Sequence, residues 1–174
     1  ILKEINIDKI PSNYTYFYNE YINEEDENLT KIKINNKIIH QSKLINYFRS
    51  DVTKEDVEKD LNDLLKKVKN DKEYYISMKD IILIESLRYD GINISKKYNK
   101  LYKVADYNMP NDIQVLINNN ESGVVLLRLV EVIGQDRLKD IGSETLYFII
   151  SALNQLNMDP LRNKILLKVL PLKV

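Results

Sequence analysis

His40 is the single histidine of this 174-residue chain, and the chain contains no cysteine. Multi-histidine metal sites, cysteine-based zinc or iron–sulfur sites and thiol nucleophiles are therefore excluded. A histidine-based triad would also need a serine partner that no motif identifies, so we expect His40 to be a surface or hairpin residue without a catalytic role. With four glycines and no glycine-rich phosphate loop, the sequence lacks a dinucleotide-binding fingerprint.

One acidic run could hold a hard cation. Residues 23–28 read NEEDEN, with Asn19 and Glu20 just upstream. The run lacks the alternating Asp pattern and the central Gly of an EF-hand loop, and acidic runs are typical of solvated loops. We therefore expect no metal ion and no other cofactor.

A second group of charges could perform acid/base chemistry at one end of a predicted helix. It consists of Asp80, Glu85, Arg88 and Asp90. However, Glu85 and Arg88 stand three residues apart, where opposite charges pair on a helix surface. The sequence thus identifies no catalytic residue, and an enzyme stays a third alternative.

Two further segments could bind a partner. The tyrosines between Tyr14 and Tyr21 could stack on a sugar or a base, although packing or edge decoration is the favoured explanation. The tail from Pro160 carries four basic residues and no acidic one: Arg162, Lys164, Lys168 and Lys173. It could contact an acidic partner or lipid headgroups, or simply complement a helix dipole.

Composition limits the function classes. Lys plus Arg number 26 and Asp plus Glu number 26, so no overall positive charge attracts nucleic acid. No apolar run reaches the roughly 18 to 20 residues that a membrane-spanning helix needs. Because the chain begins at Ile1, we expect an excised or mature segment, which leaves periplasm or envelope and cytoplasm open.

Residues 1–50 form an N-terminal region with a predicted β-hairpin. The stretch LTKIKINNKIIH (residues 29–40) alternates isoleucine with lysine before Asn35-Asn36, and Asn tolerates the positive φ of tight hairpin turns. The upstream stretch NYTYFYNEY fits a strand or a helix equally well.

Residues 51–174 show helical spacing. Thr53 can cap a helix whose apolar positions are Val57, Leu61, Leu64, Leu65 and Val68, which predicts an amphipathic surface helix. Ser77-x-x-Asp80 opens another helix that stops at Gly91, after which Asn93 can cap a second helix over ISKKYNKLYKV.

The same arrangement recurs near the C-terminus. Ser143 begins a helix, Asn157 ends it, and Asp159 caps the next one, with Pro160 at its first position. The two units superimpose at a fixed offset, and Pro110 opens a helix halfway between them. A period of about 33 residues is in the range of helical-hairpin repeats, whose short connections make the paired helices antiparallel.

Two helices are apolar on most sides. In ESGVVLLRLVEVIG the polar residues Glu121, Arg128 and Glu131 form one narrow stripe, and the helix from Glu144 behaves alike, with Glu144, Ser151, Asn154 and Gln155 as its polar stripe. Such helices pack on more than one side, so we expect both to be inner helices of a layered stack.

Residues 77–174 resemble a tetratricopeptide-like α-solenoid of stacked helical hairpins, although the Trp, Leu-Gly, Ala and Phe positions of that repeat are absent. The last 55 or so residues also resemble the C-terminal ends of long, uncharacterised bacterial proteins with export signals. That resemblance implies a segment of an envelope protein and brings no known active site.

The sequence therefore predicts a mainly α protein of stacked antiparallel helical hairpins with a small N-terminal β-hairpin region. The leading hypothesis is a non-enzymatic interaction or scaffold module with a protein partner. The alternatives are a structural subunit of a larger bacterial envelope or self-associating assembly, and an enzyme with a groove of carboxylates and tyrosines.

Overall fold

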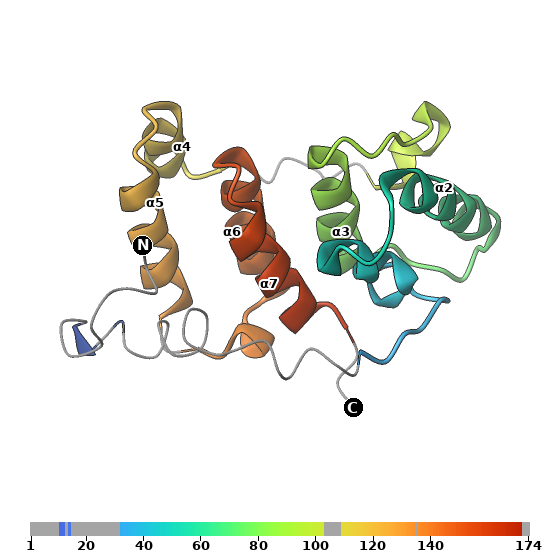
Figure 1. The fold of residues 1–174 in the computed structure, drawn as a ribbon, viewed down its shortest axis with the longest axis horizontal. Helices are drawn as coiled ribbons and strands as arrows, with labels where there is room; N and C mark the ends of the chain where they lie inside the picture. Colours follow the sequence, from blue (N-terminus) through green and yellow to red (C-terminus); the bar gives the residue numbers. More distant parts are fainter. Residues whose placement is uncertain (1–10, 13, 15–31, 103–108, 135, 172–174) are drawn as a thin grey trace.

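The computed structural model describes residues 11, 12, 14, 32–102, 109–134 and 136–171, and the chain is mainly helical there. Six α-helices are joined by short 3₁₀ helices: α2 (Lys54–Asn70), α3 (Met78–Tyr89), α4 (Asn111–Asn118), α5 (Ser122–Ile133), α6 (Ser143–Gln155) and α7 (Asp159–Val169), with η5 (Ile39–Gln41), η6 (Lys43–Arg49), η7 (Lys96–Leu101) and η8 (Leu138–Asp140). Figure 1 shows α4 and α5 at one end, α6 and α7 in the middle, and α3 and α2 toward the other end.

The predicted β-hairpin is wrong for the part of it that the structure describes. Residues 32–40 contain no β-strand and instead turn into η5. The Asn35 side chain accepts a hydrogen bond from Lys37 N (3.0 Å), and the Asn36 side chain accepts one from Lys43 N (3.1 Å). Both asparagines therefore bind backbone N–H groups locally, in competition with strand pairing.

Helices α2 and α3 begin where their capping residues predict. The Thr53 side chain accepts from Asp56 N, and Ser77 and Asp80 form a complete capping box. The five predicted apolar positions of α2 are buried, and its other side is solvated. Gly91 ends the α3 turn with φ 85°, a conformation that favours glycine.

The second helix predicted after Gly91 is wrong in its start and its type. Asn93 does not cap it, because its backbone N and its side-chain Nδ2 both donate to Glu58 of α2 (3.0 and 3.2 Å). The chain then forms only the 3₁₀ helix η7, which buries Tyr98. The segment after Gly91 is thus held against α2, and it does not form the second helix of the hairpin that the sequence spacing predicted for α3.

Two helical hairpins are present, α4 with α5 and α6 with α7. Their connections turn at Asn120 and Asn157, whose φ values are 59° and 54°. In each, the next N–H donates back to a carbonyl of the preceding helix: Glu121 N to Leu116 O, and Met158 N to Leu153 O, both 2.9 Å. The predicted cap Asp159 is instead the first residue of α7 and has no capping bond.

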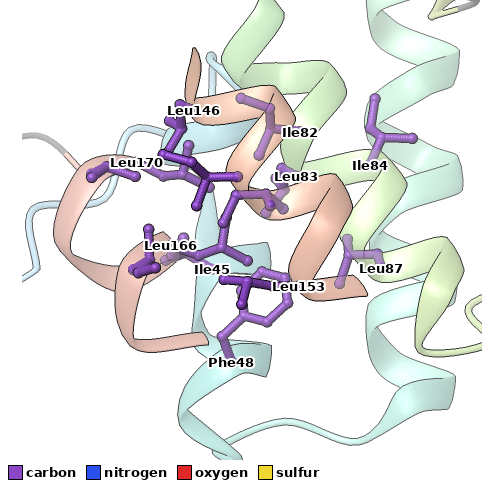
Figure 2. Packing of buried hydrophobic residues seen from close by; sticks show 14 of the residues in the cluster. Ile45, Phe48, Ile82, Leu83, Ile84, Leu87, Leu146, Leu153, Leu166 and Leu170 are labelled. Atoms are coloured by element: carbon purple, nitrogen blue, oxygen red, sulfur yellow. The ribbon is translucent and has the colours of Figure 1, made fainter. Parts of the chain in front are cut away.

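The core is centred on the contact between α3 and α6, with η6 and α7 against it. Figure 2 shows side chains from these four elements meeting: Ile45, Phe48, Ile82, Leu83, Ile84, Leu87, Leu146, Leu153, Leu166 and Leu170. The prediction that the helix from Glu144 is an inner helix therefore fits α6, although Asn154 of its predicted polar stripe is buried.

The prediction that α5 is an inner helix is wrong. Only Val125, Leu129 and Ile133 are buried, and their spacing of four marks one side of the helix. That side faces α4 and α6, and the opposite side is exposed. A helix that is apolar on most sides does not have to be covered on all of them, because burial depends on which neighbours the fold supplies.

Candidate functional site

Among the described residues, a groove of about 680 Å³ lies between the α4–α5 hairpin and α6. Its apolar walls come from the segment before α4, from α4, from α5 and from α6: Met109, Pro110, Ile113, Val132, Tyr147 and Phe148. Its polar lining is Asp112, Arg128, Glu131, Glu144, Thr145 and Ser151. This mixture of apolar walls with a few charges is typical of sites that bind an amphipathic segment.

Beside the groove, the α4–α5 hairpin carries exposed apolar side chains. Val115, Val124, Leu127 and Val132 are 55%, 43%, 50% and 47% exposed. In the described part of the chain, four of the seven large exposed hydrophobic side chains thus lie on this one hairpin. Apolar side chains concentrated on one surface element are typical of interaction sites. We call these four residues the apolar face.

The charges on α5 form a pair among the residues of this apolar face, because Glu131 lies one turn from Leu127 and Arg128 lies one turn from Val124 and Val132. Arg128 donates to the Glu131 carboxylate at 2.8 Å, and both side chains are about half exposed, at 55% and 53%. The hydrogen bond that Arg128 donates to Glu131 and the negative charge of Glu131, with a smaller effect of Asp112, raise the pKa of Arg128, so the guanidinium stays charged. The rim of the groove therefore presents fixed charges of both signs.

Tyr147 in the groove is not suited to proton abstraction at neutral pH. Burial raises its pKa, and the negative charge of Glu85 raises it further. A phenol with a raised pKa stays protonated near pH 7 and donates hydrogen bonds. Its position with the groove carboxylates matches the residue types of the enzyme alternative.

A second cluster surrounds the buried His40–Asp80 pair. His40 Nδ1 lies 2.6 Å from Asp80 Oδ1, and His40 N donates to the same oxygen at 2.8 Å. Asp80 Oδ2 accepts from the Tyr74 hydroxyl (3.1 Å), from Ser77 N and from Ser77 Oγ (both 2.9 Å). Asp80 is 1% exposed, so all of these bonds lie inside the fold.

The hydrogen bonds set the charge of Asp80. Burial alone would raise its pKa, but the bonds from His40 and Ser77 outweigh burial and hold the pKa below its ordinary value. Tyr74 behaves in the opposite way: burial is the main cause that raises its pKa to about 12, despite the Ile39 N–H that it accepts. Asp80 is thus a carboxylate at neutral pH, and Tyr74 is a neutral donor to it.

These residues do not form a catalytic triad. In a triad the serine and the carboxylate occupy opposite ring nitrogens of the histidine. Here Ser77 Oγ lies 3.4 Å from His40 Nδ1, the same nitrogen that faces Asp80, and it donates to Asp80 itself. The cluster instead joins η5 to the first turn of α3. His40 is therefore 8% exposed and not the surface residue that the sequence predicts.

A third cluster is centred on Arg162, whose side chain is 1% exposed. Its two terminal nitrogens donate to the two Asp90 oxygens at 2.8 and 2.9 Å. Further bonds run to Asn154 and Asn163, with Asp159 at 3.1 Å. Arg162 of the predicted basic tail is therefore buried and satisfied inside the protein.

The structure separates the other sequence candidates. Asp80 lies in the first turn of α3, and Asp90 follows its last turn. Ten residues along the helix separate their backbones by about 15 Å. Glu85 and Arg88 pair at 3.0 Å, as their spacing predicts. The acid/base group is therefore not assembled.

The acidic run at 23–28 and the tyrosines from Tyr16 to Tyr21 lie outside the described residues. Within the described ranges, no group of three or more His, Asp or Glu residues could hold a metal ion. In the same ranges, no helix is long and apolar enough to span a bilayer.

Sequence reasoning missed the apolar face and the Arg162 cluster. The spacing of Val125, Leu129 and Ile133 could have identified the buried side of α5, but Val and Leu on the other side hid it. Comparison with protein-family models, with curated proteins and with solved structures finds no match to this chain.

Proposed function

We propose that this chain is a non-enzymatic interaction module that binds protein through the apolar face of the α4–α5 hairpin and the adjoining groove. One observation carries the proposal. The hairpin at the end of the helical stack exposes Val115, Val124, Leu127 and Val132, where a terminal hairpin usually has a polar outer surface. A further helix packed there would continue the stack.

The occupant we favour is an amphipathic helix of a protein. The apolar face is formed by two short helices, and a helix laid against them can insert side chains at intervals of three and four residues. Arg128 and Glu131 lie among these apolar residues, where they can pair with opposite charges on such a helix.

The exposed fractions limit the affinity. Burying a Val or Leu completely contributes about 1.5–3 kcal/mol, and these four side chains are already about half buried. Together they offer about 3–6 kcal/mol, from which the cost of association and of ordering side chains is subtracted. The apolar face alone therefore supports a reversible contact, with the groove adding to it.

Cross-linking with mass spectrometry tests this function. The tagged protein is captured from extract of the cells that produce it, as wild type, as Leu127→Glu and as Tyr75→Glu. Tyr75 is 87% exposed and lies before α3, so its substitution is a matched control for adding a charge to an exposed apolar position. We expect cross-links from α4 and α5 to another polypeptide, lost in Leu127→Glu and retained in Tyr75→Glu.

Two results would contradict the proposal. Cross-links that map to other helices would place the interaction elsewhere. Links that persist in Leu127→Glu would show that the apolar face does not hold the partner. Circular dichroism of both variants checks that each remains folded.

A further inference from the structure

Asp90 and Gly91 form the single Asp-Gly step of this chain, which contains no Asn-Gly step. At such a step the backbone nitrogen of glycine can attack the side-chain carboxyl carbon of aspartate, because glycine has no Cβ that hinders the approach. Attack forms the Cγ–N bond of a cyclic succinimide, and the amide proton leaves with the carboxyl hydroxyl as water. Water then adds to either ring carbonyl, so the ring opens to aspartate or to isoaspartate without a net change in composition.

The attacking nitrogen and the carboxyl group of this step are both engaged in the fold. Gly91 N donates to Arg88 O at 2.9 Å, at the end of α3. The two Asp90 oxygens accept from the two terminal nitrogens of Arg162 at 2.8 and 2.9 Å. Two charge-assisted bonds fix the orientation of this carboxylate, and its negative charge repels a nucleophile. Ring closure therefore requires that both contacts break.

Arg162 is itself held from several sides. Its Nε and one terminal nitrogen donate to the Asn163 side chain at 3.0 and 2.8 Å, and its other terminal nitrogen donates to Asn154 at 3.0 Å. The guanidinium lies 5.6 Å from the centre of the Phe48 ring. The Arg162 and Asp90 side chains are 1% and 12% exposed. The carboxylate is therefore released only when this part of the fold opens.

A contact from α2 acts in the opposite sense. Lys54 Nζ donates to the backbone O of Asp90 at 2.6 Å. This carbonyl belongs to the peptide bond whose nitrogen attacks, and a cation beside it stabilises the deprotonated amide through which the ring closes. The peptide bond is thus polarised for closure, while Arg162 withholds the carboxyl group.

We propose that Asp90-Gly91 is a latent modification site, which converts to isoaspartate when Arg162 leaves the Asp90 carboxylate. The conversion would be lasting, because an isoaspartyl backbone contains an additional carbon and carries its carboxylate directly on Cα. The two oxygens then no longer reach the guanidinium in the same geometry, so the paired bonds cannot re-form. Molecules that have once opened at this cluster would be chemically marked.

The rate of isoaspartate formation at Asp90 tests this inference. The chain is incubated at neutral pH and sampled over time, as wild type, Arg162→Met, Arg162→Lys, Asn163→Ala and Arg88→Met. After digestion, the isoaspartyl and aspartyl forms of the peptide that contains Asp90 have equal mass, so they are separated by chromatography and quantified by mass spectrometry. A synthetic peptide of residues 89–96 gives the rate in the absence of the fold.

We expect wild type to isomerise at least about tenfold more slowly than the peptide, because only molecules opened in this region react. Arg162→Met and Arg162→Lys should isomerise at least about tenfold faster than wild type, since neither offers the two parallel bonds that fix the carboxylate. Asn163→Ala should be intermediate, because it keeps the pair and only loosens Arg162. Arg88→Met is the matched control: it removes the exposed pair with Glu85, keeps the carbonyl that binds Gly91, and should react like wild type.

Two results would overturn the inference. Wild type that reacts as fast as the peptide would show that the fold does not shield the step. Arg162 variants that are folded by circular dichroism and react no faster than wild type would show that Arg162 is not the shield. If Arg162→Met is unfolded, Arg162→Lys and Asn163→Ala decide the outcome, and the absence of acceleration in both would refute the proposal.

Discussion

The buried pair between Arg162 and Asp90 permits a quantitative prediction about stability. The guanidinium is 1% exposed, and two of its short hydrogen bonds, at 2.8 and 2.9 Å, end on the two Asp90 oxygens. Asp90→Ala removes both bonds and leaves a buried charge with only neutral acceptors and Asp159. Two charge-assisted bonds contribute about 3–6 kcal/mol, and breaking a buried ion pair costs about 3–5 kcal/mol.

We therefore expect Asp90→Ala to lower the free energy of unfolding by about 3–5 kcal/mol. For a domain of this size that corresponds to a fall in Tm of about 6–20 °C. Urea denaturation followed by circular dichroism measures it. Arg88→Ala is the matched control, because it breaks the exposed pair with Glu85 and should change stability by at most about 1 kcal/mol.

A double variant separates the charge effect from lost packing. Asp90→Ala with Arg162→Met removes both charges, so it should be more stable than Asp90→Ala alone. A loss below about 1 kcal/mol in Asp90→Ala would refute the reasoning, since it would mean that water or another group satisfies Arg162.

Three further predictions concern the core and its titrating groups. The folded pKa of Asp80 lies below its ordinary value, so its contribution to stability is present above the unfolded pKa and is lost as pH falls through the folded pKa. The stability difference between wild type and Asp80→Asn should therefore shrink on acidification. A difference in urea midpoint that stays constant with pH would contradict this. The pKa of Tyr74 is raised to about 12, so the difference in phenolate absorbance between wild type and Tyr74→Phe should rise near pH 12. The stability that Tyr74 contributes should be lost as pH increases above its unfolded-state pKa of about 10. A rise of this absorbance difference near pH 10 would show that Tyr74 is solvated. Leu83→Ala, at a fully buried position of α3, should lower the free energy of unfolding by about 2–5 kcal/mol, measured by urea denaturation. Val124→Ala, at an exposed position of α5, should change it by about 0.5 kcal/mol or less. Equal losses in the two variants would contradict the burial pattern.

Local signals in the sequence predicted several helices well. Thr53 and Ser77 start α2 and α3 because a hydroxyl that accepts a backbone N–H acts within three residues. Gly91 and Asn157 end α3 and α6 because they adopt positive φ. The predicted helical-hairpin period and the resemblances stay predictions.

Long-range contacts explain two of the predictions that were wrong. Asn93 is held by Glu58, 35 residues away, and this contact prevents the cap that its sequence position suggests. His40 is buried by Asp80, 40 residues away. Neither pairing has a periodicity that can be read along the chain, so spacing alone could not reveal it.

The sequence by itself determined that this protein is mainly helical, where several helices begin and end, and that it has no cysteine-based or multi-histidine metal site. These features depend on residue types and on contacts within a few residues. Only the tertiary structure decided that α6 is covered on several sides while α5, equally apolar, keeps one side exposed. Both helices are apolar on most sides, and the difference arises because, among the described helices, α6 lies between others and α5 lies at one end.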